Sequence, residues 1–323
     1  MKSRMKSRRL AMLYSATTLA ALLMMMPSML AQETSAPAAV HTRMTVSVNV
    51  PTDKRMPEIN PEDVIVKQAK ERLQVTEWVP ARGDRAGLDL FILIDDASDT
   101  RLGSHLDDLR KFISAQPPTT AVGVGYMRDA TVQIAQNFTR DHAVAANAVR
   151  LPLGTPGAYG SPYLSVIDLM QRWPESPNRS EVVMVTDGID RARRGVRWPG
   201  LNIIPDVDSA GEVAMRTGTM IHTIYVPGVG RWHRNYWEAT NGQLGIAKLS
   251  DMTGGESYYL GLQRPVSIAP YLDDLQKVLD NQYLLSFSTK PGKKAELQYV
   301  DLNTEVAGVE FAASDAVWVP SAQ

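Results

Sequence analysis

Oxygen-bearing side chains follow two apolar segments of this chain, and they have the chemistry of a site for a hard metal ion. Residues 88–94, LDLFILI, form the first segment, and residues 182–186, VVMVT, form the second. The side chains in question are Asp95, Asp96, Ser98 and Thr100 after the first segment and Asp187 after the second. Carboxylate and hydroxyl oxygens are the kind of ligand that Mg²⁺ prefers. The two segments therefore predict one shared, oxygen-rich site.

The elements that must position these side chains are parallel strands, because short apolar segments of this kind are typical of strands covered by helices on both faces. Between the two segments, residues 102–114 carry apolar side chains at helical spacing, and Ser161 before Pro162 is a signal for the start of a helix. Strands and helices alternate up to residue 281, which predicts an α/β fold with a doubly wound, Rossmann-like open sheet. Ligands bind such sheets at the carboxyl ends of the strands, where the aspartates stand.

Further strands are predicted on both sides of this α/β region. They are residues 43–50, 64–67 and 73–78 before it and residues 283–288, 295–302 and 306–312 after it. We expect the last three to form a meander and to pack with the first three as one small β module split around the α/β domain. The predicted organisation is residues 1–31 as a signal peptide or N-terminal anchor, 32–42 as a flexible leader, 43–86 as a β unit, 87–282 as the α/β domain and 283–320 as C-terminal strands.

The N-terminus has the pattern of an export signal. Five basic residues lie within the first nine, an apolar segment covers residues 10–26, and an imperfect small-x-small cleavage site ends at Ala31. The apolar segment also approaches the length that spans a bilayer, so a retained anchor is the alternative. We therefore expect an exported protein, periplasmic or extracellular, which touches the membrane only through this segment if the segment is kept.

The composition excludes several classes of function. The chain of 323 residues has no cysteine, which excludes thiol catalysis, thiolate metal sites and disulfides. Its 34 basic residues face 35 acidic ones, and the five basic residues of the N-terminus leave a mildly acidic remainder. A nucleic-acid-binding protein would need a dominant basic face, so we expect no nucleic-acid partner.

Three motifs together resemble the von Willebrand factor type A domain and its metal-ion-dependent adhesion site. Asp96, Ser98 and Thr100 have the form D-x-S-x-T, Ser161 follows Gly160 at the start of a helix, and Asp187 stands between Thr186 and Gly188. Residues 248–255, KLSDMTGG, resemble a late signature of bacterial members, and the resemblance covers about residues 88–281. It implies Mg²⁺, or Mn²⁺ or Ca²⁺, held by Asp96, Ser98, Thr100, Ser161 and Asp187. It also implies an open coordination position that accepts an acidic side chain of a partner protein in adhesion or another protein–protein interaction.

The sequence does not decide which aspartate, Asp95 or Asp96, is the first residue of the first motif. Helix spacing after the motif favours Asp96 as its first aspartate, whereas strand spacing before it favours Asp95. With Asp95 in that place, Ala97 and Asp99 stand where the hydroxyls belong. The two registers predict different proteins, namely a working metal site or a metal-free interaction module that kept the fold.

Two further groups are candidates for binding a partner. Arg191, Arg193 and Arg194 predict a basic rim that steers an acidic partner, with a solvated loop as the alternative. Trp232, Tyr236 and Trp237 lie in a predicted loop over residues 227–243, where aromatic side chains anchor partners or pack within the loop.

Catalysis is not expected. Asp95 and Asp96 after an apolar strand superficially resemble the Mg²⁺-dependent phosphohydrolases of the haloacid dehalogenase type, whose two aspartates are separated by one residue (D-x-D). Asp95 and Asp96 are adjacent, so both cannot face one phosphate. The sequence also has no G-x-S-x-G elbow and no glycine-rich phosphate loop.

Overall fold

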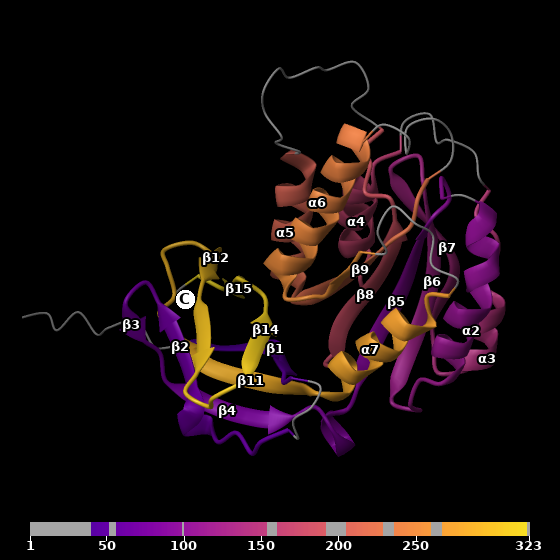
Figure 1. Cartoon of the computed structure of the whole chain (residues 1–323). Coiled ribbons are helices and arrows are strands. Elements are labelled where there is room, and N and C mark those ends of the chain that lie inside the picture. Colours follow the sequence, from indigo (N-terminus) through magenta and orange to yellow (C-terminus); the bar gives the residue numbers. More distant parts are fainter. Residues whose placement is uncertain are drawn as a thin grey trace, which may run out of the picture. The chain divides into compact units, whose positions relative to one another are not determined.

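A mixed six-stranded sheet forms the centre of the structure, a computed structural model that describes residues 40–51, 56–98, 100–153, 160–191, 205–228, 236–259 and 267–321 (Figure 1). The strand order is β10-β9-β8-β5-β6-β7. The strands are β5 (Leu88–Asp95), β6 (Thr120–Arg128), β7 (Thr131–Thr139), β8 (Arg179–Thr186), β9 (Thr219–Tyr225) and β10 (Ser257–Tyr258). Only β7 is antiparallel to its neighbour among these described strands.

The path of the chain through this sheet is that of a doubly wound fold. From β5 the chain moves outward through β6 to β7, then crosses back to β8 and moves outward through β9 to β10. The direction reverses between β5 and β8, and such a switch point opens a crevice at the carboxyl ends of the two strands. The predicted α/β fold is confirmed, and the crevice lies where the sequence places the aspartates.

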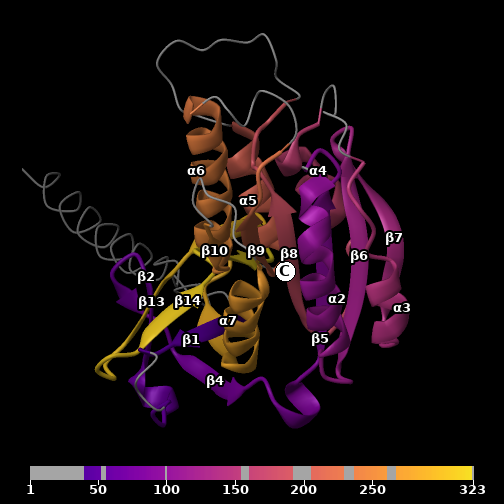
Figure 2. The same ribbon diagram turned by 45° about the vertical axis from the view of Figure 1, so that its right-hand side comes forward.

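Helices cover both faces of the sheet (Figures 1 and 2). On one face lie α2 (Leu106–Ser114), α3 (His142–Asn147) and α7 (Ala269–Asp280), and on the other lie α4 (Pro162–Gln171), α5 (Pro205–Thr217) and α6 (Tyr236–Thr253). All eight residues of β5 are buried because both of its faces are covered: Ile92 and Ile94 pack in the α2 side core, and Phe91 and Leu93 pack in the α4 side core. This double coverage explains the continuous apolar run in the sequence.

Two helix boundaries differ from the prediction. The helix expected over residues 102–114 begins as a 3₁₀ helix, η3 (Thr100–His105), before α2. Helix α6 begins at Tyr236, although a loop was expected up to residue 243. Gly242 lies within this helix, and its lack of a side chain serves packing, since a Cβ there would lie 2.3 Å from the carbonyl oxygen of Asp187.

The N-terminal and C-terminal strands pack together as expected, in three small sheets. Their orders are β14-β1-β11-β4, β13-β2-β3 and β12-β15. The strands before the α/β region are β1 (Val40–Asn49), β2 (Val64–Gln68), β3 (Glu71–Arg72) and β4 (Val75–Pro80). Those after it are β11 (Gln282–Thr289), β12 (Glu296–Tyr299), β13 (Asp301–Thr304), β14 (Glu310–Ala313) and β15 (Ala316–Val319). Short 3₁₀ helices η1 (Pro61–Asp63) and η2 (Gly83–Arg85) complete the described elements outside the sheets.

The prediction of a C-terminal meander was wrong. Strands β13 and β14 pair with β2 and β1 from the N-terminal part, and β12 pairs with β15, which the sequence did not predict. The shared core explains this, because Val46, Val66 and Phe287 pack in one apolar cluster with residues of the C-terminal strands. Strand β1 also starts at Val40, inside the expected leader, since Val40 pairs with Thr289 of β11.

No helix among the described residues is long and apolar enough to cross a membrane. The predicted signal or anchor segment, residues 1–31, lies outside the described residues.

Candidate functional site

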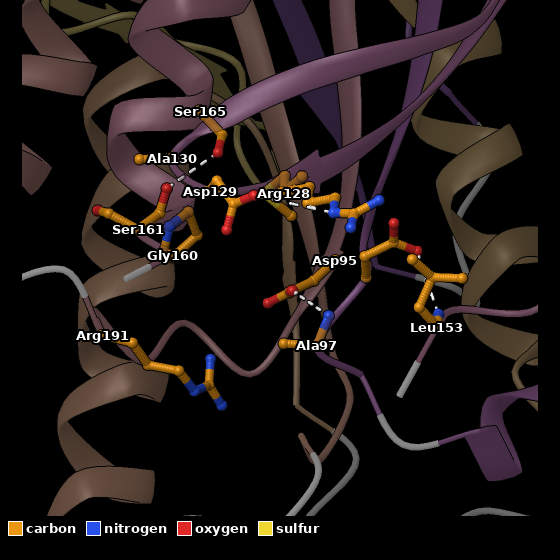
Figure 3. Close-up of a pocket in the computed structure, with 13 residues that line it drawn as sticks. Asp95, Ala97, Arg128, Asp129, Ala130, Leu153, Gly160, Ser161, Ser165 and Arg191 are labelled. Atoms are coloured by element: carbon orange, nitrogen blue, oxygen red, sulfur yellow. Dashed lines mark hydrogen bonds and ion pairs between the residues drawn. The ribbon is translucent and has the colours of Figure 1, made fainter. Parts of the chain in front are cut away.

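The candidate site lies at the switch point between β5 and β8. Asp95 is the last residue of β5, Asp187 directly follows β8, and Ser161 precedes α4. Asp95, Ser161 and Arg191 line one cavity, and the side chains of Asp95 and Arg191 point into it (Figure 3). Three sequence segments thus meet at one edge of the sheet, as the motifs predicted.

Asp95 is the aspartate that faces Asp187, and this decides the register. Its carboxylate accepts a hydrogen bond from the backbone N–H of Ala97 at 2.8 Å and another from the Thr186 hydroxyl at 2.8 Å. Thr186 in turn accepts the backbone N–H of Gly188 at 3.1 Å. Burial, and then the nearby charge of Asp187, raise the pKa of Asp95 to about 6, while the guanidinium of Arg191 opposes this rise. A buried acid beside a second acid needs a cation nearby.

The carboxylate of Asp96 is bound by Arg150, away from the Asp95–Asp187 pair. Arg150 donates to both of its carboxylate oxygens, at 2.7 and 2.9 Å, and the guanidinium of Arg150 also lies 3.7 Å from the ring centroid of Tyr126. The backbone N–H of Leu153 adds a third donor to Asp96 at 3.3 Å. Bidentate arginine–carboxylate pairs have specific geometry, so Asp96 is fixed to Arg150 and not to the other members of the predicted metal site.

Asp187 is paired with Arg191, four residues further along the chain. The guanidinium donates to both carboxylate oxygens of Asp187, and one of these bonds measures 3.2 Å. Arg191 is only 3% exposed, and its backbone N–H donates to the carbonyl of Gly160 at 2.8 Å, which ties the loop after β8 to the start of α4. The prediction of a basic rim is therefore wrong for Arg191, because its guanidinium is buried against Asp187 and does not face solvent.

The hydroxyl residues of the predicted motif have separate roles. Ser161 caps α4, where its Oγ accepts the backbone N–H of Leu164 at 3.4 Å. Ser98 is buried, its backbone bridges to Gly228, and its Oγ has no hydrogen-bond partner among the described residues. The side chain of Thr100 lies outside the described part of the chain, as does Asp99.

The predicted Mg²⁺ site, with Mn²⁺ or Ca²⁺ as alternatives, does not fit these residues. Asp187 and Asp96 each give both carboxylate oxygens to an arginine, and Ala97 offers no hydroxyl in the register that Asp95 sets. In the described part of the chain, no three acidic or histidine side chains are grouped as metal ligands. Asp96, Ser98, Ser161 and Asp187 are thus not assembled around one ion, and the side chain of Thr100 lies outside the described residues.

Large apolar side chains are exposed on two segments, the first turn of α6 and the residues after Arg150. Tyr236 and Trp237 are 64% and 72% exposed on the first turn of α6, with their rings edge to face at 5.9 Å. Leu151 and Leu153, 53% and 47% exposed, lie on the chain that leads away from Arg150. These leucines were not predicted as candidate residues. Two leucines on either side of a proline, where no helical repeat continues, indicate an exposed apolar site. Arg193, Arg194 and Trp232 lie outside the described residues.

Comparison with known proteins gives distant structural matches only. The sequence matches no protein-family description and no curated protein. A von Willebrand factor type A protein from Catenulispora acidiphila is 9% identical, with 89% of this chain and 74% of that chain covered and a TM-score of 0.42. An aerotolerance-related membrane protein from Bacteroides fragilis is 12% identical, with 60% and 99% covered and a TM-score of 0.40. The SpRpn10 VWA domain is 16% identical, with 58% and 93% covered and a TM-score of 0.37. The family that the sequence motifs resemble is therefore among the structural matches.

Proposed function

We propose that this chain is a protein-interaction module that binds its partner at the carboxyl edge of the six-stranded sheet, without a divalent ion in the contact. The observation that carries the proposal is the set of exposed apolar side chains around the edge, Leu151, Leu153, Tyr236 and Trp237. Aromatic and leucine side chains gain free energy when a partner removes them from water, and large aromatics dominate the energetics of many interfaces.

The two apolar groups flank the same centre. Leu153 lines the cavity that Asp95 and Arg191 also line. On the other side, the charge of Glu238, next to Trp237, acts on the guanidinium of Arg191. A partner that contacts both groups would therefore cover the cavity, where the charge of Asp187 is already paired with Arg191.

Binding is favoured over catalysis by the state of the carboxylates. Asp96 and Asp187 are held by Arg150 and Arg191, and Asp95 accepts two hydrogen bonds from its own neighbourhood. A phosphohydrolase would need a carboxylate free to attack phosphorus or to hold Mg²⁺. The same pairing argues against adhesion through an ion that takes a partner's acid.

Export belongs to this proposal on the strength of the sequence. The basic and apolar pattern of residues 1–31 suits a protein that works outside the cytoplasm. Cell fractionation and N-terminal sequencing of the mature chain test this part, since a cytoplasmic protein that keeps Met1 would contradict it.

Site-specific photo-crosslinking in the producing cells tests the interaction surface. A photoreactive amino acid replaces Leu151 or Tyr236 in separate variants, and Tyr299 on β12 serves as the matched control because it is an aromatic residue that is 62% exposed. We expect one partner to be crosslinked from both Leu151 and Tyr236, with the same yield after chelation by EDTA, and not from Tyr299. Crosslinks that arise only from Tyr299, or equally from all three positions, would reject the proposal.

A further inference from the structure

Two buried carboxylates stand next to each other at the switch point, and such a pair is costly without a cation. Asp95 and Asp187 are 6% and 0% exposed, and each charge disfavours the other. Ionised carboxylates that are taken out of water require a counter-charge and hydrogen-bond donors. A divalent ion is one solution to this problem, and a guanidinium is another.

We infer that Arg191 is a built-in cation that occupies the place of a metal ion between Asp95 and Asp187, so that the site is permanently assembled and closed to divalent ions. Its guanidinium donates to both oxygens of Asp187 and also acts on the charge of Asp95. Unlike an ion, it cannot dissociate, because it is attached to the chain four residues after Asp187.

The surroundings of the guanidinium are shaped to hold it. Gly228 packs against the pair so closely that a Cβ there would lie 2.0 Å from Oδ2 of Asp187 and 2.7 Å from Nη2 of Arg191. The bridge between Gly228 and Ser98 keeps this backbone in place, and the bond from Arg191 N–H to the carbonyl of Gly160 anchors the other side. The guanidinium is therefore enclosed on several sides by backbone.

Removal of the Arg191 guanidinium would leave oxygen ligands that can bind a divalent ion. Once the guanidinium is removed, Asp95 and Asp187 have lost their shared counter-charge, and the Oγ of Ser98, buried and without a partner among the described residues, is a further oxygen in the same segment. Two carboxylates with a hydroxyl and water make a ligand set for Mg²⁺ or Mn²⁺. Substitution of Arg191 should thus convert a metal-independent protein into a metal-dependent one.

The contrast between the buried Arg191 and the exposed Arg150 supplies a matched control. Arg150 also pairs bidentately with an aspartate, Asp96, but burial and charge from a second acid do not converge on that pair as they do on Asp95 and Asp187. Removal of Arg150, whose side chain is 43% exposed, frees only the carboxylate of Asp96, so an ion would gain only one acidic ligand there.

Thermal unfolding of the full mature chain with Mn²⁺ or EDTA, without any partner, is the test. For the wild type we expect the unfolding midpoint to be the same in both solutions. We expect Arg191→Ala to unfold at a lower temperature in EDTA and to gain about 3–8 °C in Mn²⁺ at ten to a hundred times its Kd. Arg150→Ala should lose stability without any gain from Mn²⁺.

A second variant covers the case in which Arg191→Ala does not fold in EDTA. Arg191→Gln keeps a hydrogen-bond donor towards Asp187 and removes the charge, and it should show the same dependence on Mn²⁺ in calorimetric titration, with one ion bound per chain. The inference is overturned if the wild type binds Mn²⁺ in a way that Asp187→Asn abolishes, or if folded Arg191→Gln binds no ion. Because no partner is used, this result is independent of the proposed interaction surface.

Discussion

Replacement of Asp95 by asparagine is expected to stabilise the protein at neutral pH, although it alters a buried polar position of the site. Asparagine has the shape of aspartate, so its oxygen can accept the N–H of Ala97 and its amide can donate to the hydroxyl of Thr186. The variant therefore keeps the bond from Ala97 and reverses the bond with Thr186, and its main effect is to remove the buried negative charge.

The magnitude follows from the raised pKa of Asp95, which burial and Asp187 bring to about 6 from 3.8. Between these two values the folded state holds a proton that the unfolded state has released, so the free energy of unfolding falls as pH rises from about 4 to about 6. A difference of about two pKa units corresponds to about 3 kcal/mol. Asparagine is neutral at every pH, so Asp95→Asn should be more stable than the wild type by up to about 3 kcal/mol at pH 8 and by much less at pH 4.

Urea unfolding followed by tryptophan fluorescence at pH 4 and pH 8 measures both values, and EDTA in every sample removes divalent ions. Asp96→Asn is the control, because it weakens a charge-assisted pair with Arg150 and should destabilise the protein at pH 8. The reasoning is refuted if Asp95→Asn is less stable than the wild type at pH 8, or if its advantage is equal at the two pH values.

Three further substitutions test the packing around the site. Asp187→Asn removes the carboxylate that pairs with the buried guanidinium of Arg191, and chemical denaturation should show a loss of about 3–5 kcal/mol; a loss below about 1 kcal/mol would contradict the buried pair. Gly228→Ala should lower the unfolding midpoint because its Cβ would lie 2.0 Å from a carboxylate oxygen of Asp187, whereas Gly160→Ala, whose Cβ would meet no described atom within 4 Å, should not. Ala130→Gly should raise the free energy of unfolding by about 0.5–1 kcal/mol, since Ala130 holds a φ of 61° in the turn between β6 and β7; an unchanged or lower value would show that this backbone is not strained.

The sequence by itself determined the sheet and the edge at which the site lies. Continuous apolar runs such as those of β5 and β8 are typical of strands that are covered on both faces. Asp95 ends β5, and Asp187 directly follows β8. The pair Ser161 and Pro162 marked the start of α4, and the structure confirms the serine cap. These features are local, so a strand or helix period reveals them.

The flanking strands and the first turn of α6 could be predicted only in part. Strand pairing such as that of β13 with β2 joins residues more than two hundred positions apart, and nothing in a local pattern selects that partner over a neighbouring strand. Gly242 lowers helix propensity, yet tertiary contact with the backbone of Asp187 makes it the residue that fits.

The nature of the site was decided by the tertiary structure. Helix spacing and strand spacing in the sequence disagreed about whether Asp95 or Asp96 faces Asp187. In the folded chain, Asp95 accepts the hydroxyl of Thr186 from β8, whereas Asp96 is paired with Arg150. Arg191 stands in a segment without a regular period, so its bond with Asp187 could not be derived from spacing. A cation in contact with a carboxylate depends on where the chain returns in space, and for this reason the sequence suggested a metal ion where the folded chain places a guanidinium.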